Sequence, residues 1–119
     1  MIWVKIASIL MLLGVALGAF GSHALRGKLT EYSLEVYKTA VLYHFIHALG
    51  LFVVAWLSTI APQDPRIAWA GILMVAGILL FSGSLYIICF TGVRAFGAIT
   101  PLGGLCFLAA WVLLFTSRI

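Results

Sequence analysis

The chain has 119 residues, of which 65% are hydrophobic and 8% are charged. A soluble domain carries about 45–50% apolar and about 25% charged residues, so this composition excludes an ordinary soluble fold. The formal net charge of +4 rests on seven basic and three acidic side chains, too few and too scattered for a nucleic-acid-binding surface. The acidic residues Glu31, Glu35 and Asp64 all lie outside the apolar runs, so we expect no carboxylate catalysis and no enzyme.

Four long apolar runs follow one another, and a membrane-spanning helix needs about 20 such residues. They cover residues 2–20, 36–60, 67–90 and 98–116. The first run also has features of a signal peptide, but we expect it to be retained as a span. Continuous runs without alternation argue against a β-barrel. The sequence therefore predicts an all-α, integral-membrane four-helix bundle that forms a single domain over residues 1–119.

The only sizeable polar segment, residues 22–38, lies between the first two spans. Thr30 is a suitable N-cap and Glu31 fits the first turn of a helix. A helix running from there to Ile60 would be about 46 Å long, which exceeds the roughly 30 Å hydrocarbon core. We expect either that its first two turns lie among the headgroups or that a short interfacial helix or loop precedes the second span.

Small residues allow helix backbones to approach each other in lipid. The candidate packing positions are Gly14, Gly18, Gly21, Gly77 and Gly103. Packing within the bundle is the favoured interpretation, and a dimer face is the alternative. Gly14 and Gly18 in particular are expected to touch the backbone of another helix, so that Gly18→Leu would overfill the contact.

The aromatic residues divide by depth, because four spans place both termini on one side of the membrane. The tryptophans fall toward the terminus side, and the tyrosines toward the other: Trp3, Trp56, Trp69 and Trp111 against Tyr32, Tyr37, Tyr43 and Tyr86. Since indoles favour membrane interfaces, the tryptophans are interpreted as an anchor belt.

Polar side chains collect at depth on the tyrosine side, which marks a polar cluster or binding pocket. Its candidate members are His23, Arg26, Tyr43, His44, His47, Ser82, Ser84, Tyr86, Arg94 and Thr100. A hydrogen-bond network is favoured over a substrate or lipid-headgroup pocket, a haem or metal site, or a serine nucleophile. No carboxylate lies near the histidines, and the two cysteines lack zinc spacing, so no metal or cofactor is expected. His47 should be buried, neutral and hydrogen-bonded to Tyr86, Ser82, Ser84 or His23.

Four ordered motifs resemble an uncharacterised family, that of transmembrane protein 256 (domain of unknown function 423). They are GAFGSHAL at 18–25, TAVLYHFIHAL at 39–49, LFSGSLY at 80–86 and ITPLGG at 99–104. The chain departs from the family pattern at Ser22, where a second alanine is expected, and at His44, where glutamine is common; His47 matches. The resemblance implies a small four-span inner-membrane protein without an assigned activity.

The favoured function is a non-enzymatic structural or assembly module. The alternatives are a small transporter or channel with a lipid- or solute-binding pocket near His47, and a haem or redox subunit using His47 and His23. Multidrug exporters of similar size use an intramembrane glutamate, which these spans lack. Expected partners are the lipid bilayer of the bacterial inner membrane and a homo-oligomer or larger membrane complex. Four basic residues in the first and third loops, against three on the other side, favour both termini outside.

Overall fold

The computed structural model describes all 119 residues and contains helices but no strands. The first two spans are α1 (Ile2–His23) and α2 (Glu31–Ile60). The third comprises α3 (Pro65–Gly77), a π-helix η1 (Ile78–Ser82) and α4 (Gly83–Thr91), and the fourth comprises a 3₁₀-helix η2 (Arg94–Ala98) and α5 (Thr100–Phe115). All four spans are long and apolar enough to cross a membrane. The predicted all-α, four-helix membrane fold is confirmed.

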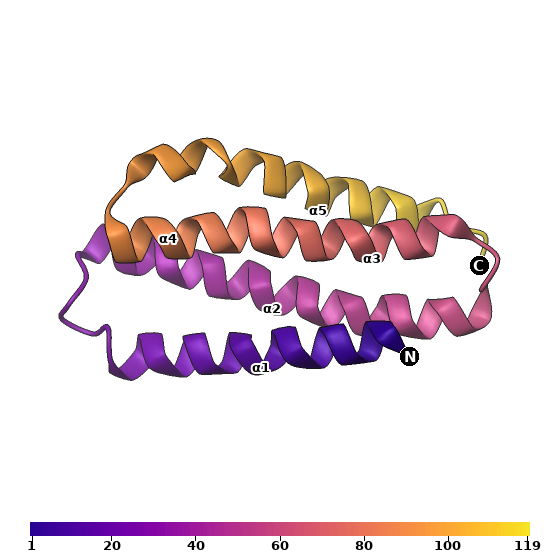
Figure 1. The fold of residues 1–119 in the computed structure, drawn as a ribbon, viewed down its shortest axis with the longest axis horizontal. Helices are drawn as coiled ribbons and strands as arrows, with labels where there is room; N and C mark the ends of the chain where they lie inside the picture. Colours follow the sequence, from indigo (N-terminus) through magenta and orange to yellow (C-terminus); the bar gives the residue numbers. More distant parts are fainter.

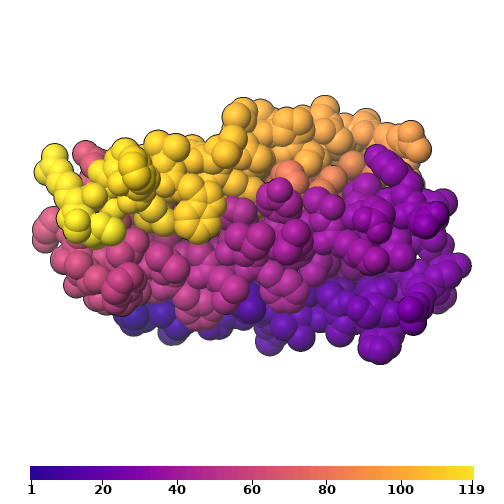
Figure 2. Space-filling view, turned by 180° about the vertical axis from the view of Figure 1, so that it is seen from behind, coloured from indigo at the N-terminus to yellow at the C-terminus, as the bar shows by residue number.

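The four spans lie side by side in chain order rather than in a square (Figure 1). α1 packs chiefly on α2, α2 on α3 and α4, and α3 on α5. The molecule is accordingly flat, measuring 49 × 26 × 17 Å. Seen from behind, α1, α2 and α5 follow one another across one face (Figure 2). This arrangement makes α1 and α5 the outer helices.

The loop between α1 and α2 ends at an N-cap, as the sequence indicates. The Thr30 hydroxyl oxygen accepts a hydrogen bond from the Ser33 backbone N–H at 3.1 Å. From Glu31 the helix continues unbroken for 30 residues, about 45 Å. Of the two expected arrangements, the structure therefore has a loop followed by one long helix, whose length exceeds the roughly 30 Å of a hydrocarbon core.

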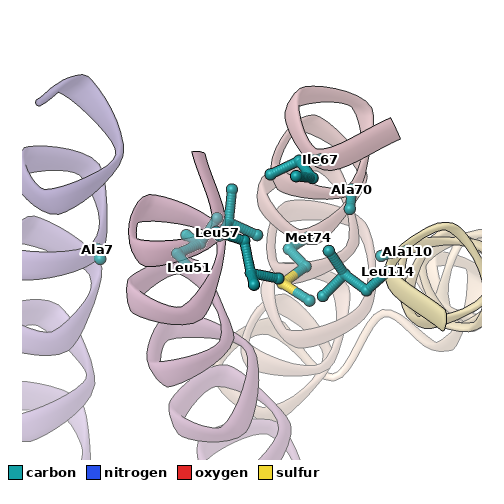
Figure 3. Close-up of a cluster of buried hydrophobic side chains, with 9 residues drawn as sticks. Ala7, Leu51, Leu57, Ile67, Ala70, Met74, Ala110 and Leu114 are labelled. Atoms are coloured by element: carbon teal, nitrogen blue, oxygen red, sulfur yellow. The ribbon is translucent and has the colours of Figure 1, made fainter. Parts of the chain in front are cut away.

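The main core joins all four spans in the half of the molecule that carries the termini (Figure 3). Its nine residues are Ala7, Leu51, Val54, Leu57, Ile67, Ala70, Met74, Ala110 and Leu114. Three of them are alanines, which keep neighbouring backbones close and leave room for Leu51 and Met74. The interior of this half is therefore held together by apolar packing.

Gly103 lies directly against the backbone of a neighbouring helix. A Cβ added there would collide with the backbone of Phe81 in the π-helix η1, so only glycine fits without moving α5. Gly21 and Gly77 instead make room for aromatic rings, those of Tyr37 and Phe107. These glycines are therefore packing positions of two different kinds.

The expected backbone contacts at Gly14 and Gly18 are not what the structure has. The atoms nearest to a Cβ at Gly14 belong to the Phe45 ring, at 2.9 Å. At Gly18 the nearest atom is a Val41 methyl carbon at 3.5 Å, an ordinary van der Waals distance. α1 and α2 diverge toward this end (Figure 1), so side chains rather than backbones fill the space between them.

A polar clasp closes the end of the molecule that carries the termini. The Asp64 carboxylate caps α3 by accepting from the Arg66 backbone N–H at 3.0 Å, and it accepts from the Arg118 backbone N–H at 2.6 Å. The Arg66 guanidinium donates to the carbonyl of Thr116. The hydrogen bonds from Arg118 and then Arg66 lower the pKa of Asp64 below its ordinary value. The clasp thus ties the α2–α3 loop to the chain end.

Trp111 departs from the predicted tryptophan belt. Its indole N–H donates to His47 Nε2 at 3.0 Å, and its ring lies against Gly50. His47 is the seventeenth of the 30 residues of α2, close to the middle of the span. Trp56 and Tyr86 do lie at different depths, since Tyr86 contacts His44, about 18 Å along α2 from Trp56. The indole of Trp111 reaches inward because a buried imidazole offers it an acceptor.

Candidate functional site

His44 connects three spans through its imidazole ring. Its Nε2 lies 2.7 Å from the Leu10 carbonyl of α1, and its Nδ1 lies 2.9 Å from the Tyr86 hydroxyl of α4. Because a carbonyl only accepts, Nε2 carries the proton and Nδ1 accepts from the tyrosine. The ring is 3% exposed, and both nitrogens are satisfied inside the protein. This geometry fixes α1 and α4 to α2 at one level.

His47 makes a second, separate connection, from α2 to α5. Its Nδ1 donates to the Tyr43 carbonyl at 2.8 Å, and its Nε2 accepts from Trp111. The ring stacks on Phe107 with centroids 3.5 Å apart and planes inclined by 9°. His47 is buried, as predicted, but the predicted partners Tyr86, Ser82, Ser84 and His23 were wrong.

Two serines flanking Gly83 bind different helices. Ser82 donates to the Ala40 carbonyl of α2 at 2.7 Å, whereas Ser84 lies 2.6 Å from the Thr100 hydroxyl of α5. Between them, the N–H of Gly83 donates to the carbonyl of Ile78, five residues earlier, which is the hydrogen-bond pattern of a π-helix. Such single-turn insertions are frequent at functional sites. Here the insertion lies opposite Gly103, between two polar connections.

The remaining candidates do not join this network. His23 and Arg26 line an open groove between α1 and α2, and Arg94 lies 5.8 Å from the Tyr32 ring centroid outside the bundle. His23 follows Leu10, the α1 residue that meets His44, by 13 positions, or about 20 Å of helix. The structure therefore does not bring His23 and His47 together as the axial pair of a haem.

Two grooves flank the polar connections. One, of about 970 Å³, lies between α1 and α2 near the first loop. The other, of about 710 Å³, is lined by Tyr43, His47, Phe107 and Trp111 between α2 and α5. No buried side-chain nitrogen or oxygen lacks a hydrogen-bond partner, and no three His, Cys, Asp or Glu residues are grouped to hold a metal ion.

Sequence reasoning missed Tyr37 and assigned Trp111 to another role. The Tyr37 hydroxyl donates to the Leu17 carbonyl of α1, and its ring fills the space that Gly21 leaves. The signal was present, since a tyrosine on the polar side of one span faces a glycine near the end of the preceding one. Pairing the two required knowing that α1 and α2 are antiparallel neighbours.

Four apolar spans connected by internal histidine, serine and tyrosine hydrogen bonds define a small multi-pass membrane protein. Residues 17–104 match the family described as "Protein of unknown function (DUF423)", and the chain belongs to this family. The confirmed resemblance spans most of the chain.

Curated relatives are similar over nearly the whole length. The chain is 47% identical over 118 residues to UPF0382 membrane protein YwdK of Bacillus subtilis (strain 168), which covers 99% of this chain and 96% of that protein. It is 40% identical over 116 residues to UPF0382 membrane protein SH2409 of Staphylococcus haemolyticus (strain JCSC1435), covering 98% and 93%. No solved structure matches. The relatives are bacterial membrane proteins, and their names assign no activity.

Proposed function

We propose that the protein is a non-enzymatic structural or assembly module of the bacterial inner membrane. The observation that carries this proposal is the side-by-side order of the spans, which leaves the outer faces of α1 and α5 without a protein neighbour. The exposed large residues of α5 are Leu102, Leu105, Leu108, Trp111, Val112 and Phe115. Four of them form one stripe: Leu105, Leu108, Val112 and Phe115. Their 3-4-3 spacing matches the seam of left-handed helix packing, so α5 is the favoured contact face.

The use of the polar side chains supports a role without chemistry. The two candidate nucleophiles, Ser82 and Ser84, donate hydrogen bonds from their hydroxyl groups to the carbonyls of Ala40 and Phe81, respectively. Neither contacts a base that could activate it, which nucleophilic catalysis requires. The same hydrogen bonds hold the helices in register, a function that an assembly module needs.

Oxidative cross-linking in native membranes tests the α5 face. In a Cys89→Ala, Cys106→Ala background, Leu108→Cys should form a disulfide-linked dimer on mild oxidation. The matched control is Leu79→Cys, which is equally exposed to lipid but lies on the third span. We expect the α5 variant to cross-link many times faster than this control.

Extraction into native lipid discs provides the second measurement. A mass corresponding to two or more chains of 12.9 kDa, or to one chain with another membrane protein in fixed ratio, agrees with the proposal. Single chains in the discs, together with equal cross-linking of both variants, would contradict it.

A small transporter or channel is the second candidate, favoured by the groove beside His47. Tyr43, His47 and Trp111 provide polar atoms in an otherwise apolar lining near the middle of the span. Proteoliposomes loaded with a panel of small ions and neutral solutes would test it, with Trp111→Phe as the variant expected to change the flux. Flux equal to that of empty liposomes would leave the assembly role.

A further inference from the structure

The groove between α1 and α2 combines an apolar interior with a basic end. The two helices diverge toward the loop that joins them (Figure 1), and the opening has a volume of about 970 Å³. Sites for small molecules commonly measure about 300–1,000 Å³. The groove is open along its side, so its contents would come from the lipid phase.

Its interior is lined by apolar side chains from both helices. Val15 and Ala19 of α1 face Val41 and Phe45 of α2. Between them Gly18 has no side chain, and a Cβ there would meet nothing closer than 3.5 Å. The groove is wide at this point because Gly18 has no side chain and no neighbouring backbone occupies the space beside it. Its apolar walls suit a hydrocarbon chain.

Basic side chains gather where the groove meets the first loop. The lining contains His23, Arg26 and Lys38 and no acidic residue. Lys38 lies 3.8 Å from Glu35, but both side chains are largely exposed, and such pairs are weak. Arg26 has no ion-pair partner in the chain. An anion at this end would therefore meet a guanidinium that is free to bind it.

We propose that this groove binds one anionic phospholipid, with an acyl chain between α1 and α2 and its phosphate between Arg26 and Lys38. Basic pockets between membrane helices bind anionic headgroups, and guanidinium groups form strong paired hydrogen bonds with phosphate. Lys38 is seven residues inside α2, about 10 Å along the helix, and its long side chain can extend to the headgroup level. The site is independent of the α5 face.

Native mass spectrometry of the purified full-length protein tests the proposal. The protein is mixed with equal amounts of phosphatidylglycerol and phosphatidylcholine carrying the same chains, and the retained adducts are counted. We expect one phosphatidylglycerol per chain, retained with about tenfold preference or more. No preference in the wild type would overturn the proposal.

Charge variants separate a built site from general attraction. Arg26→Gln with Lys38→Gln should abolish the preference. Lys5→Gln with Lys28→Gln removes the same charge from residues outside the groove and should retain it. An equal loss in both double variants would mean that net charge alone attracts the lipid, which contradicts the proposal.

Filling the groove tests the position of the chain. Gly18→Leu should lower phosphatidylglycerol retention about as much as the double charge variant does. If the Gly18→Leu protein does not elute like the wild type, Ala19→Leu is tested in its place. Unchanged retention in whichever variant folds would overturn the placement. Glycerol 3-phosphate, which lacks acyl chains, should fail to displace the lipid; displacement at equal concentration would assign the basic end to free phosphate instead.

Discussion

Composition alone does not show which polar side chains form hydrogen bonds inside the protein, and single residues in the structure do. His44 and His47 are three positions apart on α2, yet they bind opposite neighbours, α1 with α4 and α5 respectively. Burial of His47 followed from its depth in a span. Its partners did not, because Trp111 was placed at the interface from residue type, while the available acceptor in the interior decided its orientation.

Tyr86→Phe should lower the free energy of unfolding by about 0.6 kcal/mol and by no more than about 1.7 kcal/mol, the average and the maximum for hydrogen bonds between membrane helices. The substitution keeps the ring but removes the hydroxyl that contacts His44. Unfolding in mixed micelles with increasing dodecyl sulfate measures the change. Tyr43→Phe is the matched control, since that hydroxyl forms no hydrogen bond within the chain. Equal effects of the two variants would contradict this assignment.

Asp64 makes the chain end sensitive to acid. Because its pKa is lowered in the folded protein, the carboxylate stabilises the clasp above the unfolded pKa of about 3.9, and this contribution is lost as the pH falls through the folded value. Hydrogen exchange of the Arg118 amide should therefore be slow near neutral pH and accelerate at low pH, after correction for intrinsic rates. Asp64→Asn should exchange faster at neutral pH and respond less to acid; a wild-type pH profile would contradict the role.

At the scale of the element, the third span could be placed from its apolar run but not resolved into three parts. The residues of η1, ILLFS, carry no proline or charge that would mark a π-helix. The insertion lies where Gly103 of α5 meets the Phe81 backbone, a tertiary contact that local sequence does not encode. By contrast, Thr30 before Glu31 marks the start of α2 correctly.

Gly103→Ala should destabilise the bundle by about 1–3 kcal/mol, as overpacking usually does. The added methyl group meets the Phe81 backbone, which cannot turn aside as a side chain could. Gly104→Ala is an ideal neighbour for comparison, because its nearest atom is a Phe81 ring carbon at 3.9 Å. Thermal unfolding in detergent measures both. Similar midpoints for the two variants would show that α5 shifts without penalty.

At the scale of the whole molecule, the number and approximate limits of the spans follow from hydropathy, since lipid permits little else. The flat order does not follow, because short loops are equally compatible with a square bundle. Aromatic side chains also form contacts between helices that are not adjacent in this row. Trp3 of α1 lies against Gly71 of α3, and Trp111 of α5 reaches Gly50 and His47 of α2.

Membrane orientation is predicted from the basic residues of the loops. Arg26, Lys28, Lys38 and Arg94 lie on the side opposite the termini, so we expect this side to face the cytoplasm. A C-terminal alkaline phosphatase fusion should then be active and a fluorescent-protein fusion dark. The reverse pattern would place both termini inside. Reversing Arg94 and Lys28 to Glu should shift the population toward that state.

The side-by-side order also bears on biogenesis. The main packing partner of each span is a span adjacent to it in the chain, so the contact can form as soon as the second of the two enters the bilayer. Insertion can therefore proceed as successive helical hairpins, with few competing helix pairings. The Asp64–Arg118 hydrogen bond is different, since it joins residues 54 positions apart and links the α2–α3 loop to the segment that follows the fourth span. It can form only after the fourth span has entered the bilayer, later than the contacts between helices that are neighbours along the chain.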